Sequence, residues 1–138
     1  MKIWYGYGSE HSMNLVMVGH FRDEDQAKKA KWMIEQIQEF VQGEVDAGRM
    51  EIGSPENQYS DRIRELLERL NFFHASPAEF DQLGYDFSVK QDGTDLVLTT
   101  DEVDVSMFLK LFVHSGARVE VYSAHEYPDT DYGRGKSK

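Results

Sequence analysis

Residues 85–100, YDFSVKQDGTDLVLTT, carry the pattern that decides the fold. Between Tyr85 and Val89, apolar and polar side chains alternate, as they do in a strand with one buried face. The Asp-Gly pair that ends at Gly93 is typical of a tight hairpin turn. This stretch therefore predicts an antiparallel hairpin in which residues 96–100 form the second strand.

The segment after the hairpin predicts a helix and a closing strand. Residues 102–114 have apolar side chains at spacings of three and four, which is the pattern of an amphipathic helix. Gly116 is expected to end this helix, and residues 117–123, ARVEVYS, alternate again as a strand. The side chains expected to face the core from this helix are Val105, Phe108, Leu109 and Phe112.

Nearer the N-terminus, residues 13–21, MNLVMVGHF, are almost continuously apolar and predict a central strand. Asp23 is expected to cap a long helix that runs to about Val45. The helix has one apolar stripe, and we expect Trp32 and Met33 to pack in the core rather than to bind a cofactor.

Three further segments complete the prediction. Residues 2–8, KIWYGYG, are rich in aromatic side chains and predict a strand. Residues 46–58 are polar and predict a loop, and an amphipathic helix follows that ends near Leu70. Ser76 is expected to begin a short helix with Pro77 at its first position.

The predicted order of elements is β-β-α-α-α-β-β-α-β, an α+β fold with a mostly antiparallel sheet and helices on one face. The core order, β-α-β-β-α-β, is the split βαβ or ferredoxin-like arrangement, with an extra N-terminal strand and inserted helices. Strand 13–21 already has two neighbours in that arrangement, so residues 2–8 would lie at a sheet edge; two ββα units with a closing strand are the alternative. We expect a single α+β domain over residues 1–127 and a flexible tail over residues 128–138.

Composition excludes several classes of function. The 138 residues include 15 Lys and Arg and 25 Asp and Glu, which gives a net charge of −10. Nucleic acids and anionic membranes are bound largely through Lys and Arg, so we expect neither as a partner. The chain has no cysteine, which excludes disulfides, thiolate metal sites and cysteine nucleophiles. The N-terminus lacks an apolar stretch long enough for a signal peptide, and we expect a cytoplasmic protein.

The opening residues 2–21, KIWYGYGSEHSMNLVMVGHF, resemble an uncharacterised bacterial family that is defined only as a domain of unknown function. The resemblance implies no activity, substrate or site. Within it, residues 6–11, GYGSEH, begin like a dinucleotide-binding fingerprint, but they lack the third glycine and precede a strand rather than a helix. We therefore expect no cofactor.

One cluster of polar residues is a candidate site. If strands 13–21 and 117–123 run antiparallel side by side, the loop before the first lies close to the segment after the second. Two histidines and two carboxylates at one sheet end could bind a small molecule or a divalent metal, or perform acid–base chemistry. Polar loops at sheet ends are also common without any such role. The residues concerned are Glu10, His11, His125 and Glu126, with Tyr5 and Tyr7 as walls.

These observations favour a small acidic protein-binding or regulatory module without catalytic activity, of the inhibitor, immunity-factor or accessory-subunit type. Its charge would attract a basic partner surface, and Trp4 and Tyr122 are candidate contact residues. The alternative is a small-molecule or divalent-metal binding protein, with or without catalysis, at the polar cluster. An exposed edge strand, 2–8 or 85–90, could also pair with its copy in a homodimer.

Overall fold

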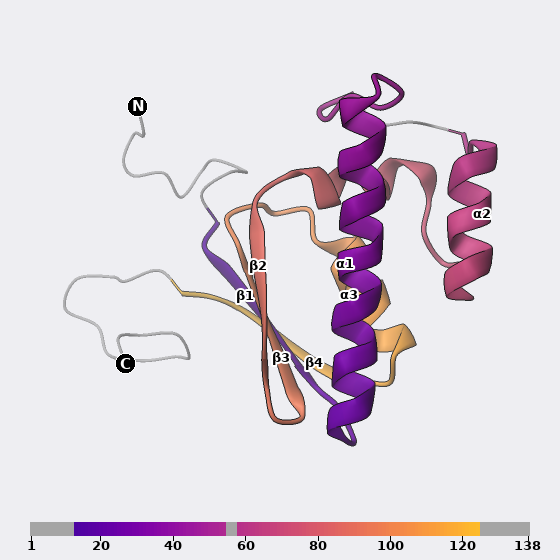
Figure 1. Ribbon diagram of the computed structural model, residues 1–138. Helices are drawn as coiled ribbons and strands as arrows, with labels where there is room; N and C mark the ends of the chain where they lie inside the picture. Colours follow the sequence, from indigo (N-terminus) through magenta and orange to yellow (C-terminus); the bar gives the residue numbers. More distant parts are fainter. Residues whose placement is uncertain (1–12, 55–57, 125–138) are drawn as a thin grey trace, which may run out of the picture.

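The computed structural model describes residues 13–54 and 58–124 (Figure 1). The predicted strand 2–8 and tail 128–138 lie outside this part of the chain. No helix in the two described ranges is long and apolar enough to cross a membrane. The elements are β1 (Leu15–His20), α1 (Glu24–Asp46), α2 (Asp61–Leu70), the 3-10 helix η1 (Pro77–Gly84), β2 (Phe87–Asp92), β3 (Asp95–Thr100), α3 (Ser106–His114) and β4 (Arg118–Ser123).

The four strands form one antiparallel sheet in the order β2-β3-β1-β4. The predicted hairpin is confirmed, because β2 pairs with β3 across a turn in which Gly93 has φ 63°, a value that glycine adopts readily. The predicted pairing of strands 13–21 and 117–123 is also confirmed, with Leu15 opposite Ser123. The fuller ferredoxin-like description, with its extra strand at residues 2–8, stays a prediction.

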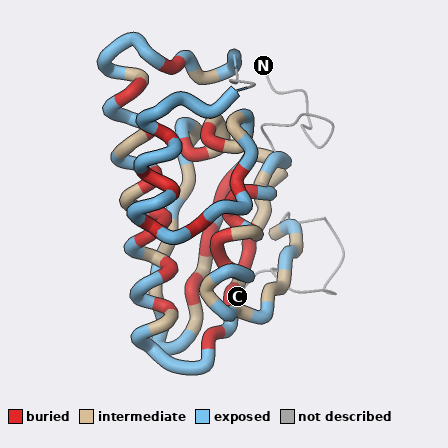
Figure 2. The backbone as a smooth tube through the Cα atoms, turned by 90° about the vertical axis from the view of Figure 1, so that its right-hand side faces the viewer, coloured by how far each residue is buried: buried red, intermediate tan, exposed pale blue. Residues whose placement is uncertain are grey.

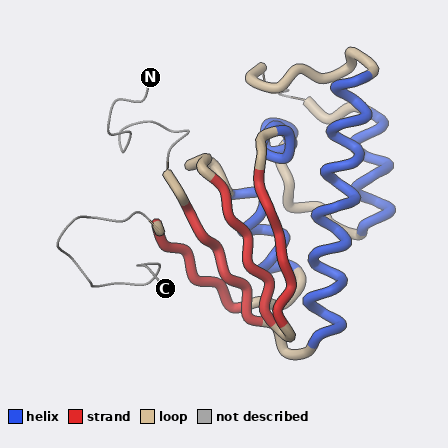
Figure 3. The backbone as a smooth tube through the Cα atoms, turned by 60° about the vertical axis from the view of Figure 1, so that its left-hand side comes forward, coloured by secondary structure: helices blue, strands red, loops and turns tan. Residues whose placement is uncertain are grey.

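The helices lie on one face of the sheet, so that the fold is a two-layered α+β domain as predicted (Figure 3). Figure 2 shows buried residues along the strands and on the sides of the helices that contact them. Met17, Leu96 and Leu98 are almost fully buried beneath the helices. A Cβ atom added to Gly19 would lie 2.6 Å from the ring of Phe112, so glycine lets α3 pack closely against β1.

The N-terminal end of α1 is capped as predicted. The carboxylate of Asp23 accepts a hydrogen bond of 2.9 Å from the backbone N–H of Gln26. Met33 is buried, but the prediction that Trp32 packs in the core is wrong, because its side chain is 45 % exposed. At 100° per residue, Trp32 lies on the side of the helix away from Ala30, outside the buried stripe.

Helix α3 begins at Ser106, four residues later than the sequence predicts. The backbone N–H of Glu102 donates instead to the hydroxyl of Thr100 at 3.2 Å, a local bond that competes with helix formation. Leu109 is 39 % exposed, so its predicted place in the core is also wrong. It lies 100° beyond Phe108, past the edge of the buried stripe of α3.

Candidate functional site

The six residues of the predicted polar cluster lie outside the described part of the chain; they are Tyr5, Tyr7, Glu10, His11, His125 and Glu126. The described residues that adjoin them do lie together. The N–H of Ala124 donates to the carbonyl of Asn14 at 2.8 Å, and the N–H of Met13 donates to Asp101 at 2.9 Å. The two segments that carry the predicted cluster therefore join the sheet at the same end.

A hollow of about 340 Å³ lies at this end of the sheet. Its polar groups are two carboxylates, three hydroxyls and one amide, and no Lys or Arg is among its lining residues. Within residues 13–54 and 58–124, no three His, Asp or Glu side chains are grouped so that they could hold a metal ion. The hollow therefore offers acceptors for a cation but no complete metal site of its own. It is lined by Asn14, Asp86, Phe87, Ser88, Thr99, Thr100 and Asp101.

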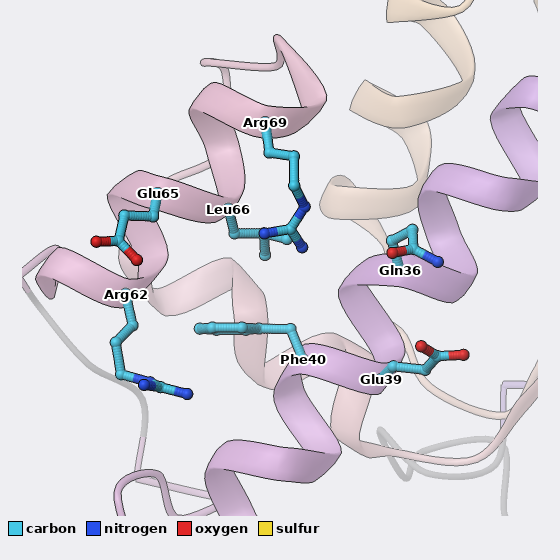
Figure 4. A pocket seen from close by; sticks show the side chains of 7 residues that line it. All are labelled: Gln36, Glu39, Phe40, Arg62, Glu65, Leu66 and Arg69. Atoms are coloured by element: carbon cyan, nitrogen blue, oxygen red, sulfur yellow. The ribbon is translucent and has the colours of Figure 1, made fainter.

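A second hollow, of about 350 Å³, is a groove between α1 and α2 (Figure 4). The ring of Phe40 points from α1 toward α2 and contributes to its floor with Leu66, which is almost fully buried. The ring of Phe40 also makes an edge contact with the ring of Phe80 of η1, with ring centroids 6.3 Å apart. Polar side chains surround this apolar floor: Gln36, Glu39, Arg62, Glu65 and Arg69.

One end of the groove is fixed by a buried carboxylate. Glu44, which is 4 % exposed, accepts hydrogen bonds from the guanidinium groups of Arg49, at 2.9 and 3.0 Å, and of Arg62, at 2.8 Å. The bond from Arg49, and then that from Arg62, hold the pKa of Glu44 below its usual value against the opposing effect of burial. This cluster joins the end of α1 to the start of α2 and sets the position of Arg62 at the groove.

Sequence reasoning missed Glu44, although its spacing carried a signal. It follows Val41 by three residues and Ile37 by seven, which places it on the buried stripe of α1. A carboxylate at such a position requires partners, and arginines at 49 and 62 supply them.

The other end of the groove leads to two exposed aromatic side chains. Gln36 and Arg69 lie at this end, on α1 and α2 respectively (Figure 4). Trp32 lies one helical turn before Gln36 on the same side of α1. Phe73, which is 60 % exposed, follows the C-terminal end of α2. Large exposed aromatic rings of this kind are typical of protein contact surfaces.

Comparison with known proteins gives a family but no function. No curated protein and no solved structure matches the chain. A family model described as a family of unknown function, DUF6375, matches residues 1–134, far more than the twenty residues at the N-terminus that suggested a resemblance. The chain therefore belongs to DUF6375, a family of unknown function.

Proposed function

We propose that the chain is a cytoplasmic protein-binding or regulatory module, without catalytic activity of its own, that docks a partner protein on its α1–α2 side. The observation that carries this proposal is the pair of exposed aromatic side chains, Trp32 and Phe73, beyond one end of the groove. Exposed Trp and Phe side chains supply large contact areas at little cost in conformational entropy. Trp32 lies within α1, and Phe73 lies three residues after the end of α2.

The groove itself supports docking of a protein rather than capture of a small ligand. Its floor of Phe40 and Leu66 can take one apolar side chain from a partner. Within the described part of the chain, the side chains of Arg69, Glu39 and Glu65 make no hydrogen bond or ion pair, so these charges remain available at the rim. An apolar centre with a charged rim is the usual anatomy of a protein interface.

The expected partner has a net basic surface and presents an apolar side chain. A net charge of −10 attracts such a protein from a distance and raises its rate of association. Contacts at the groove and the two aromatic side chains would then determine how long the complex lasts. Binding is accordingly expected to weaken as salt is added, because salt screens the long-range attraction.

The proposal is tested by site-specific photo-cross-linking in the native cells. A photoreactive residue replaces Gln36 at the groove or, as the matched control, Gln38, which is exposed on another side of α1. We expect one protein to be cross-linked from position 36 and not from position 38. Equal cross-linking from both positions, or none from position 36, would contradict the proposal.

Binding is then measured directly with the purified cross-linked protein. Trp32→Ala and Phe73→Ala are each expected to weaken its Kd at least about tenfold, as central contact residues do. Val103→Ala, at another exposed apolar side chain, is the control and should leave Kd unchanged. Equal Kd values for all three variants would mean that the partner binds to another surface.

The alternative function is binding of a divalent metal or small molecule at the polar cluster of Glu10, His11, His125 and Glu126. It is supported by the hydrogen bond between Ala124 and Asn14, which joins the described residues next to both segments. A metal that binds only the folded chain would raise its Tm by mass action. The double change His11→Ala and His125→Ala should abolish that shift, and a shift that persists would exclude these ligands.

A further inference from the structure

The face of the sheet turned away from the helices carries a specific arrangement of charges. Register places its side chains in three rows that cross the sheet in the order β2, β3, β1, β4, and no helix within residues 13–54 and 58–124 covers them (Figure 3). We call this surface the outer face. Its rows are Ser88, Thr99, Val16 and Tyr122; Lys90, Val97, Val18 and Glu120; and Asp92, Asp95, His20 and Arg118.

The middle of the outer face is apolar. Val97 and Val18 are half-buried side by side in the middle row, whereas Val16, between Thr99 and Tyr122, is only 8 % exposed and adds little to the surface. Charged side chains lie at both ends of that row and throughout the last one. A central apolar strip with charges at its borders is the composition of a contact surface rather than of a solvated sheet.

The charges of the outer face are complementary to themselves. A twofold axis parallel to the strands, between β3 and β1, brings β2 opposite β4 of a second copy and β3 opposite its β1. Lys90 then faces Glu120 of the second copy, and Asp92 faces its Arg118. From these positions we propose that two copies of the chain associate through their outer faces about this axis.

The same axis also places the β3 residue of each row opposite the β1 residue of that row in the second copy. Val97 lies opposite Val18 of the second copy, which joins the two apolar strips, and Asp95 lies opposite its His20. Facing sheets are about 10 Å apart, so side chains of the length of Lys and Glu meet between them. An isologous contact of this kind uses each pair twice.

The other face-to-face orientation is disfavoured by like charges. A twofold axis across the strands, through the middle row, would place Lys90 against its own copy and Glu120 against its own copy. Like charges that face each other across an interface weaken binding strongly. Charge therefore selects the axis parallel to the strands.

The size of the surface sets the concentration at which association is expected. Four strands of six residues span about 20 Å by 20 Å at ordinary strand spacings. Such a patch, about 400 Å² on each copy, is smaller than a standard specific interface and is typical of weak, transient contacts. We therefore expect a reversible dimer whose population changes over the micromolar range.

Sedimentation velocity over a concentration series of the full chain measures this equilibrium. We expect the unchanged chain to dimerise, and Lys90→Glu or Glu120→Lys alone to weaken the dimer at least about tenfold, because each places like charges opposite one another. Circular dichroism confirms that each variant is folded. Glu120 also contacts His20 at 3.5 Å within one copy, so the single reversal at 120 is interpreted only together with the reversal at 90 and with the mixture of the two.

Mixing the two variants tests the geometry. In a mixed pair, the glutamate introduced at 90 faces the lysine introduced at 120, and the unchanged Lys90 faces the unchanged Glu120. We expect the mixture to dimerise as tightly as the unchanged chain although neither variant does so alone. Within one copy these two positions are three strand spacings apart, about 14 Å, so an internal ion pair does not explain such a rescue.

Three results would overturn the proposal. The first is a monomer at all concentrations, which would leave the outer face to another segment of this chain or to a different protein. The second is a dimer that neither single reversal weakens, which would place the contact elsewhere. The third is a weakened dimer that mixing does not restore, which would exclude the proposed axis.

Discussion

The two faces of one sheet differ in what they contribute to this protein. Along β3, Leu96 and Leu98 face the helices and are almost fully buried, whereas Val97 between them faces outward and is half-buried. Along β1 and β3 the inner face is mostly apolar and buried, while the outer face combines an apolar middle with charged borders. Successive residues of one strand thus have two roles in this account: the inner ones stabilise the fold, and the outer ones form the surface on which association is proposed.

The largest expected effect is on the inner face. Leu98→Ala removes buried side-chain atoms beneath the helices and should lower the free energy of unfolding by about 2–5 kcal/mol. Val97→Ala, on the outer face of the same strand, is the matched control and should cost less than half as much. Urea unfolding of both variants measures the difference, and equal losses would abolish the distinction between the faces.

The next effect concerns the helical layer alone. Glu44→Gln leaves Arg49 and Arg62 without their carboxylate and should lower the free energy of unfolding by about 1–3 kcal/mol, a value reduced because both arginines are partly solvated. The exposed Glu39→Gln is the control.

The same carboxylate predicts a dependence on pH. Because the folded-state pKa of Glu44 is lowered from 4.5, its stabilisation is present above pH 4.5 and is lost as pH falls through the folded value. The free energies of unfolding of the unchanged chain and of Glu44→Gln should therefore approach each other as pH is lowered from 7 to 3. If the difference between the two free energies stays constant with pH, the stabilisation does not come from ionised Glu44.

Two histidines, one on each side of the sheet, are expected to have a smaller effect on how stability depends on pH. On the outer face, the hydrogen bond of 2.9 Å that Nδ1 of His20 donates to the carboxylate of Asp95, and then the contact with Glu120, raise the pKa of His20. Its stabilisation is therefore present below pH 6.5 and is lost as pH rises through the folded value. In the helical layer, burial, and then the charges of His74 and Lys29, lower the pKa of His114.

The two histidines should thus contribute opposite slopes of stability against pH. The unchanged chain should lose stability as pH rises through the folded-state pKa of His20, and His20→Asn should abolish this loss. The unchanged chain should also lose stability as pH falls below 6.5 because of His114, and His114→Asn should abolish that loss. Both changes are expected to be under about 1 kcal/mol, because His20 is 43 % exposed and His114 is also exposed. Thermal melts from pH 5 to pH 8 measure them, and slopes of the same sign would show that one environment is misassigned.

The smallest effect on stability is expected at the border of the outer face. Lys90→Ala should change the free energy of unfolding by less than about 0.5 kcal/mol, because the side chain is exposed. It should nevertheless weaken association of the chain, while Lys28→Ala on α1 should affect neither property. A large loss of stability in Lys90→Ala would mean that the outer face also stabilises the fold.

Local signals in the sequence predicted much of this fold. The hairpin of residues 85–100 and the cap at Asp23 depend on side chains close in sequence, and both were predictable. The later start of α3 was not, because it depends on a bond between Glu102 and Thr100 that competes with the helical pattern. The exposure of Trp32 was missed because hydrophobicity was given more weight than its angle around α1.

The candidate surfaces were harder to predict because they depend on register. The residues of β3, DLVLTT, give little sign of two faces, and Lys90 is aligned with Glu120 only through the pairing of all four strands. The groove likewise requires the packing of α2 against α1, which no local pattern specifies. The predicted cluster of Glu10, His11, His125 and Glu126 stays a prediction, although the strand ends that adjoin it lie together.

The most direct test of the difference between the faces uses the absence of cysteine from the chain. Thr99→Cys places one thiol on the outer face beside the proposed axis, and Gln38→Cys places one on the exposed side of α1. Each variant is treated with a bismaleimide that spans about 10 Å, the separation of facing sheets. We expect a rapidly formed covalent dimer from Thr99→Cys and little from Gln38→Cys; equal rates from both, or no dimer from Thr99→Cys, would contradict the proposed role of the outer face.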